Sequence, residues 1–151
     1  MTWYPPLQPL STRKSVTVQF TKLEIIHDQD GWFDGAGKIF VSYKILNGNV
    51  LISHDTLPNM APGDTPATVP LNDGQAWDDL KGPHTRFDTN APQITVQASV
   101  FDEGSFFTEH DDKLRHDLDR TFYRNSNYGA GTHVHDTDDY RLHYTITTVD
   151  D

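Results

Sequence analysis

Strict alternation between apolar and polar residues is the feature that most constrains the fold of this chain. Two segments show it, residues 93–100 and residues 140–147. Side chains on a β-strand point alternately to opposite faces of a sheet, so a period of two predicts a strand with one buried face. The apolar positions of the two predicted strands are Ile94, Val96, Ala98 and Val100 in the first, and Tyr140, Leu142, Tyr144 and Ile146 in the second.

Two further patterns predict strands nearer the start of the chain. Alternation in residues 16–20 changes phase in residues 23–25, which predicts a β-bulge or the junction of two strands near Thr21. A β-branched and aromatic run at 39–46 is followed by Asn47-Gly48 and then by an apolar run. Asn-Gly between two such runs predicts a β-hairpin, because both residues tolerate a positive φ.

The middle of the chain is less regular. Six prolines fall within residues 53–92. Because proline cannot donate a backbone hydrogen bond, we expect only short edge strands there, near 67–71 and 85–88. One short helix is predicted at 111–122, where three apolar residues recur at a spacing of four: Leu114, Leu118 and Phe122.

These elements predict an all-β chain whose 151 residues form one antiparallel β-sandwich with long acidic loops. The prolines near the start favour an extended conformation, so we expect residues 1–14 to form an N-terminal arm and residues 15–151 to form the domain. No apolar run approaches the length of a membrane span, and the first residues do not resemble a signal peptide. We therefore expect a soluble protein, of a location that the sequence does not specify.

The net charge of the chain limits the classes of ligand that it can be expected to bind. Lysine and arginine total 12 against 22 aspartate and glutamate residues, which gives a formal net charge of −10. Nucleic-acid binding requires clustered cations, and no basic run is longer than Arg13-Lys14. The chain has no cysteine, which excludes disulfides and thiolate metal sites. Cations are the expected ligands of such an acidic protein.

Three acidic segments stand beside predicted strands, at residues 27–35, 101–112 and 136–139. Asp and Gly are common in turns, so turn formation alone is one explanation of these segments. Ca²⁺, however, requires six to eight oxygen ligands, which carboxylates on neighbouring loops can supply. An EF-hand is excluded, because the Glu required at position twelve of its loop is missing. The candidate metal ligands are Asp28, Asp30, Asp34, Asp102, Glu103, Asp111 and Asp112.

Two of these segments resemble the calcium loops of C2 domains. Asp28, Gly31 and Asp34 have the spacing of the family's first calcium loop, and the strand expected after it begins at residues 39–41. Residues 100–102 match the start of the third loop, and residues 110–112 match its end with one or two residues inserted. The resemblance implies a C2-like sandwich that binds Ca²⁺ and docks on phospholipid. A jelly-roll-type sandwich is the alternative architecture.

The resemblance covers residues 21–45 and 94–114 and departs from the family pattern in three ways. The proline-rich middle of the chain matches nothing specific in the family. Gly104 occupies the position of the second aspartate of the third loop, where the neighbouring Glu103 is a possible substitute. Gly35 stands where the family has a proline after the second aspartate of the first loop.

Aromatic residues lie inside both of these acidic loops. If the loops share one end of the sandwich, their rings can enter a lipid interface or contact a protein or glycan partner in a calcium-dependent way. The alternative is that the rings fold back and cap the core. The residues concerned are Trp32, Phe33, Phe106 and Phe107.

A third pattern suggests different chemistry. His133 and His135 are separated by one residue, so both imidazoles fall on one face of a strand, and with Asp139 they resemble the first metal motif of cupins. Only twelve residues follow Asp139, too few for the second cupin motif. The leading hypothesis is therefore a non-enzymatic, calcium-binding C2-like module. The alternatives are a carbohydrate-binding or structural sandwich stabilised by calcium, and a small cupin-like metal-dependent enzyme.

Overall fold

The structure is a computed structural model that describes residues 13–26, 37–57, 69–71, 76–77, 85–102, 112–114 and 116–150. Its elements in chain order are β1 (Lys14–Ile25), β2 (Gly37–Asn47), β3 (Val50–Leu57), β4 (Val69–Leu71), β5 (Ala76–Trp77), β6 (Thr85–Thr89), β7 (Gln93–Asp102), β8 (Asp112–Lys113), β9 (Leu118–Tyr123), the 3-10 helix η1 (Arg124–Gly129), β10 (Gly131–Asp136) and β11 (Tyr140–Asp150).

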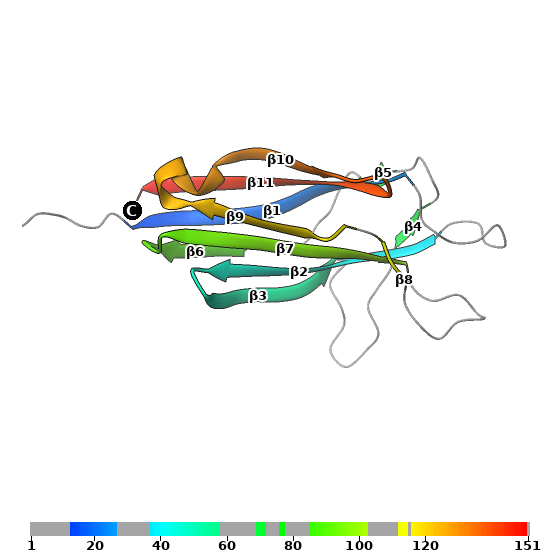
Figure 1. Cartoon of the computed structure of the whole chain (residues 1–151), viewed down its shortest axis with the longest axis horizontal. Coiled ribbons are helices and arrows are strands. Elements are labelled where there is room, and N and C mark those ends of the chain that lie inside the picture. Colours follow the sequence, from blue (N-terminus) through cyan, green and yellow to red (C-terminus); the bar gives the residue numbers. More distant parts are fainter. Residues whose placement is uncertain are drawn as a thin grey trace, which may run out of the picture.

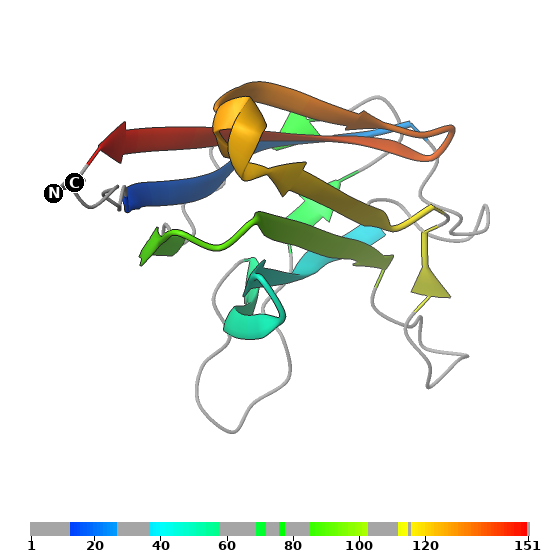
Figure 2. The same cartoon turned by 60° about the vertical axis from the view of Figure 1, so that its left-hand side comes forward.

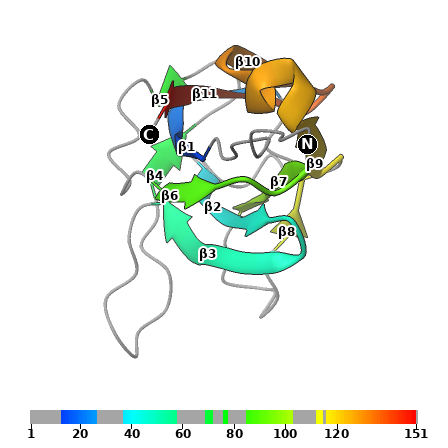
Figure 3. The same cartoon turned by 90° about the vertical axis from the view of Figure 1, so that its left-hand side faces the viewer.

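Two antiparallel sheets pack face to face (Figures 1 to 3). In the first sheet β10, β11 and β1 lie in that order, and β5 and β6 pair with different parts of β1. In the second sheet β3, β2 and β7 lie in that order, with β4 paired to β2 and both β8 and β9 paired to β7. The predicted antiparallel β-sandwich is confirmed.

The core lies between the two sheets and is built from the alternating positions. Along β7 every second side chain is buried, and the same holds from Tyr140 to Ile146 in β11. Burial of a Val, Leu, Ile or Phe side chain contributes about 1.5–3 kcal/mol, so these strands supply a large share of the stability. The predicted apolar faces of both strands are confirmed.

Two local predictions about turns and bulges also hold. The register between β1 and β11 shifts between Phe20 and Lys22, where the change of phase predicts a bulge. β2 and β3 form the predicted hairpin, although its two-residue turn is Gly48-Asn49 rather than Asn47-Gly48, since Asn47 pairs with Val50. Gly48 has a φ of 60°, a conformation that glycine adopts without steric strain.

The predicted helix at 111–122 is wrong. β8 and β9 lie in this stretch and pair with β7. A spacing of four fits one face of a strand as well as one face of a helix, because four is a multiple of two. The three apolar residues are accordingly buried in the core, two of them within β9 and one directly after β8: Leu118, Phe122 and Leu114.

The expected N-terminal arm lies mostly outside the described residues. β1 begins at Lys14, which pairs with Asp150 on one side and with Thr89 on the other. The boundary between arm and domain therefore stays a prediction. Among the described residues, no helix has the length and apolar character needed to cross a bilayer.

Candidate functional site

The ends of four strands meet at one end of the sandwich, the end at which β4, β5 and β8 lie in Figure 1. β1 and β7 end there, and β2 and β8 begin there. The register connects them, because Asp102 pairs with Ile39 of β2 on one side and with Asp112 of β8 on the other. We call this the acidic end and define it by Ile25, Ile26, Gly37, Asp102, Asp112 and the turn 137–139.

Both acidic segments that resemble calcium loops are therefore anchored at the acidic end. One runs from Ile26 to Gly37, and the other from Asp102 to Asp112. Most of the predicted ligands and all of the predicted aromatic contacts lie outside the described residues, and their placement stays a prediction. These residues are Asp28, Asp30, Asp34, Glu103 and Asp111, together with Trp32, Phe33, Phe106 and Phe107.

Asp102 is the predicted ligand whose side chain the structure describes. It continues the inward-facing positions of β7, and only 1% of its surface is exposed. Its Oδ2 atom is shielded from solvent. Burial of a carboxylate is unfavourable unless cations or hydrogen-bond donors offset the lost hydration. A buried carboxylate at the boundary between the core and an acidic segment is the type of oxygen ligand that a hard cation requires.

Asp139 is a second buried carboxylate at the acidic end, and its side chain is fully buried. It lies in the turn between β10 and β11, where the Thr137 hydroxyl accepts hydrogen bonds from the backbone N–H groups of Asp139 and Tyr140. The Asp139 carbonyl accepts a hydrogen bond of 2.7 Å from the N–H of Ile26. Of the described side chains, the buried carboxylates are these two, and both lie at this end.

Asp139 is not among the predicted calcium ligands, although residues 136–139 form one of the acidic segments. Position along the chain does not indicate that this turn bonds to the end of β1. The pairing of β1 with β11 brings them together, with Ile25 opposite Tyr140.

Tyr140 ties the two sheets together at the acidic end. Its hydroxyl donates a 2.6 Å hydrogen bond to the carbonyl of His116, which lies just before β9 and has a φ of 68°. Burial raises the pKa of Tyr140, and the negative charges of Asp117 and Asp139 act in the same direction. The phenol therefore stays protonated and remains a hydrogen-bond donor.

His133 and His135 lie on β10, and both form hydrogen bonds with backbone carbonyls of neighbouring segments. The Nε2 atom of His133 lies 2.5 Å from the carbonyl oxygen of Gly129, and that of His135 lies 2.7 Å from the carbonyl oxygen of His116. A carbonyl only accepts hydrogen bonds, so each Nε2 carries a proton and is not available to a metal in this arrangement. The His133 ring also packs between Phe122 and Tyr144.

This arrangement gives both histidines a role in packing the sandwich. Across the described residues, no group of three or more His, Asp or Glu side chains is arranged to hold a metal ion. The cupin-like hypothesis therefore gains no support from the geometry of these two residues.

No family model and no curated protein sequence matches the chain. Solved structures do resemble it. One is a C2 domain of plant extended synaptotagmin 1, with a TM-score of 0.57 and 13% identity over 91% of this chain and 95% of that domain. Another is human GIVD cytosolic phospholipase A2 in complex with a fluorophosphonate inhibitor and terbium chloride, with a TM-score of 0.59 and 11% identity over 93% of this chain.

The chain spans only 18% of the length of that phospholipase chain. A second structure of human GIVD cytosolic phospholipase A2 gives the same result, with a TM-score of 0.56, 14% identity over 91% of this chain and a span of 17% of the phospholipase. Identities this low establish the fold alone. The chain therefore has a C2-like β-sandwich fold.

Proposed function

We propose that this chain is a non-enzymatic C2-like module that binds Ca²⁺ at the acidic end and thereby docks on a phospholipid surface. The observation that carries the proposal is Asp102, a buried carboxylate at the point where β7 ends, β2 begins and β8 pairs. Both acidic segments start and finish at this end. The C2-like fold adds support, because it is the fold that the two loop spacings imply.

The donor chemistry fits a hard cation. Carboxylate and carbonyl oxygens are the ligands that Ca²⁺ prefers, and the residues that would hold it are Asp102 and the aspartates and glutamate of the two acidic segments. Terbium, present in one similar structure, is also a cation that prefers oxygen ligands. When bound, Ca²⁺ would neutralise part of the local negative charge and connect it to anionic headgroups.

Because of the net charge of the chain, docking on an anionic membrane should require Ca²⁺. At −10 the chain is repelled by an anionic membrane unless a cation intervenes, so docking without Ca²⁺ should be negligible. The aromatic residues of the two segments would then enter the interface, where Trp is favoured.

The first test is calorimetric titration of the full chain with Ca²⁺. We expect binding by the native chain, sharply weakened binding by Asp102→Asn, and unchanged binding by the control Asp150→Asn, whose side chain is 85% exposed at the opposite end. Absence of heat from the native chain at millimolar Ca²⁺ would contradict the proposal. An equal loss in both variants would place the cation elsewhere.

The second test separates calcium binding from membrane docking. Vesicles of phosphatidylserine and phosphatidylcholine are sedimented with the chain in Ca²⁺ or in chelator. We expect sedimentation only in Ca²⁺, and less of it when Trp32 and Phe107 are both changed to Ala. If the chain binds Ca²⁺ but never sediments, the partner is a protein or a glycan and the lipid part of the proposal is wrong.

A further inference from the structure

A polar pocket lies on the outer face of the second sheet. Its volume is about 280 Å³, and three strands line it. We call it the sheet-face pocket and define it by the polar side chains of β2 (Ser42, Lys44), β7 (Gln97, Ser99) and the start of β9 (Asp117, Asp119).

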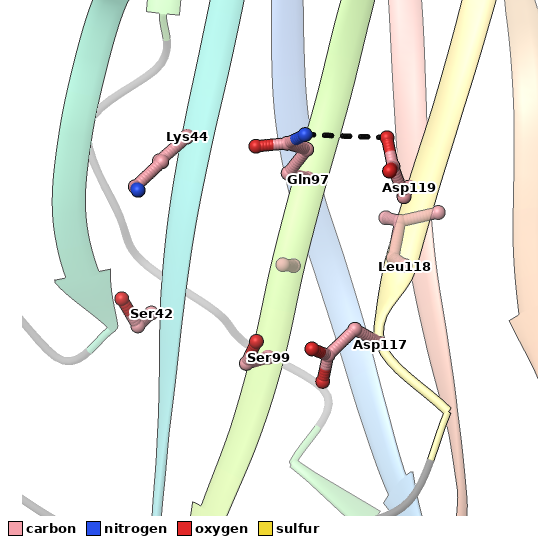
Figure 4. Close-up of a pocket in the computed structure, with 8 residues that line it drawn as sticks. Ser42, Lys44, Gln97, Ser99, Asp117, Leu118 and Asp119 are labelled. Atoms are coloured by element: carbon pink, nitrogen blue, oxygen red, sulfur yellow. Dashed lines mark hydrogen bonds between the residues drawn. The ribbon is translucent and has the colours of Figure 1, made fainter.

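Strand register arranges these side chains in two rows across the sheet. In one row Lys44 pairs with Gln97, and Gln97 pairs with Asp119. In the other, Ser42 pairs with Ser99. Figure 4 shows Lys44 and Ser42 on one side of β7 and the two aspartates on the other.

The pocket therefore has opposite charges at its two sides. Lys44 is exposed and forms no ion pair with any residue in the part of the chain that the structure describes. Asp119 accepts a hydrogen bond of 3.3 Å from the side-chain amide of Gln97, and Asp117 forms an ion pair of 3.0 Å with Lys113. The cation on β2 and the carboxylates on β9 are two strand spacings apart, about 10 Å between backbones.

We propose that the sheet-face pocket binds a small zwitterion. Its anionic group faces Lys44 and the hydroxyls of Ser42 and Ser99, and its ammonium group faces Asp119. Charge-assisted hydrogen bonds at both sides favour a ligand with both charges. A polyanion is disfavoured, because Asp119 places a negative charge at one side of the pocket and Lys113 already pairs with Asp117. A simple cation is disfavoured by Lys44 itself.

Two sources can supply this chemistry, a free metabolite and a zwitterionic lipid headgroup. The inference does not depend on calcium, so it is tested in the presence of a chelator and its failure leaves the calcium proposal untouched. The probe is O-phosphoethanolamine, and its two halves, inorganic phosphate and ethanolamine, are tested separately at the same concentration.

The measurement is the shift of backbone and side-chain amide signals in nuclear magnetic resonance spectra of the full chain. We expect O-phosphoethanolamine to shift the signals of Lys44, Gln97, Ser99 and Asp119, and neither half to do so at equal concentration. Equal shifts from phosphate alone would overturn the proposal in favour of a plain anion site. No shift at these residues from any of the three probes would also overturn it.

Variants at the two sides of the pocket sharpen the test. Lys44→Met and Asp119→Asn should each weaken binding of the probe about tenfold, which corresponds to about 1.4 kcal/mol. The matched control is Asp88→Asn, an exposed aspartate in β6 of the other sheet, which should leave binding unchanged. Equal weakening by the control would show that the probe responds to net charge and would overturn the proposal.

Vesicles of phosphatidylethanolamine, added with chelator, identify the source of the ligand. Sedimentation that depends on Lys44 indicates a headgroup, and binding of the free probe without sedimentation indicates a free metabolite. The absence of both free-probe binding and Lys44-dependent sedimentation would contradict the inference.

Discussion

The two ends of the sandwich are held in different ways. We call the other one the hairpin end and define it by the turn Gly48-Asn49, Ala91, Pro92 and η1. Hydrogen bonds to backbone carbonyls connect its segments, beside an exposed contact of Lys14 with Asn127 of η1. The N–H of Gly48 bonds to the Gln93 carbonyl, the N–H of Arg124 bonds to the Pro92 carbonyl, and the buried Tyr128 hydroxyl donates to the Ala91 carbonyl.

The acidic end, in contrast, contains both buried carboxylates of the described side chains, Asp102 and Asp139. Acidic segments are anchored beside them. Stability at the hairpin end should therefore depend on backbone conformation and packing, whereas stability at the acidic end should respond to cations and pH. The following changes test that difference, from the largest expected effect to the smallest.

Gly129→Ala should be the most damaging change, and it acts at the hairpin end. Gly129 has a φ of 71°, and an added Cβ would overlap the ring of Phe122. Strain and overlap together should lower the free energy of unfolding by about 3 kcal/mol. Urea unfolding measures the change. The control Gly48→Ala, with a φ of 60° and only ordinary contact with Ala91, should lose about 1 kcal/mol. Equal losses would show that packing against Phe122 is not the cause.

Calcium should stabilise the native chain through the acidic end. At a concentration of about 100 Kd, a ligand that binds only the folded state adds about 2.7 kcal/mol, or roughly 5–10 °C in Tm for a chain of this size. Thermal melts in Ca²⁺ and in chelator measure it. Asp102→Asn should abolish the increase, while Gly48→Ala, at the hairpin end, should keep it in full. Loss of the increase in Gly48→Ala would contradict the division between the ends.

Tyr140→Phe should have a smaller effect at the acidic end. The change removes the hydrogen bond from the buried hydroxyl to the His116 carbonyl, which is worth about 1 kcal/mol. Urea unfolding in chelator measures this loss. Because the hydroxyl serves as a tie between the sheets, the increase in Tm caused by calcium should persist. Its disappearance would make Tyr140 part of the cation site.

The ion pair of Glu24 with His143, on the outer face of the first sheet, should make the smallest contribution, and acid reveals it. The hydrogen bond of 2.9 Å from His143, with Lys22 nearby, lowers the pKa of Glu24. A lowered carboxyl pKa adds stability above its ordinary value of about 4.3, and this is lost as pH falls through the folded-state value. Urea unfolding at pH 5 and pH 3 measures the loss in the native chain and in His143→Val. The part of the loss that disappears in the variant should be below about 1 kcal/mol. An unchanged loss in that variant would show that other carboxylates cause it.

Much of the fold could be predicted from the sequence, because period-two alternation reports directly which face of a strand is buried. Ile94 to Val100 and Tyr140 to Ile146 show this. The prediction of a helix at 111–122 was wrong, because apolar residues four apart fall on one face of a strand as well as on one face of a helix. The sites could be predicted only in part. Pairing between strands distant in sequence places Asp102 between Ile39 and Asp112. It also forms the row of side chains from Lys44 to Asp119.

The most direct test of the central claim is to map Ca²⁺ onto the whole chain by amide chemical shifts. Binding at the acidic end predicts shifts at the ends of β1 and β7, at the start of β2 and in β8, with Ile26, Gly37, Asp102 and Asp112 among the residues affected. The signals of Gly48, Asn49 and η1 should stay in place. Shifts concentrated at the hairpin end, or no shift at millimolar Ca²⁺, would contradict the account.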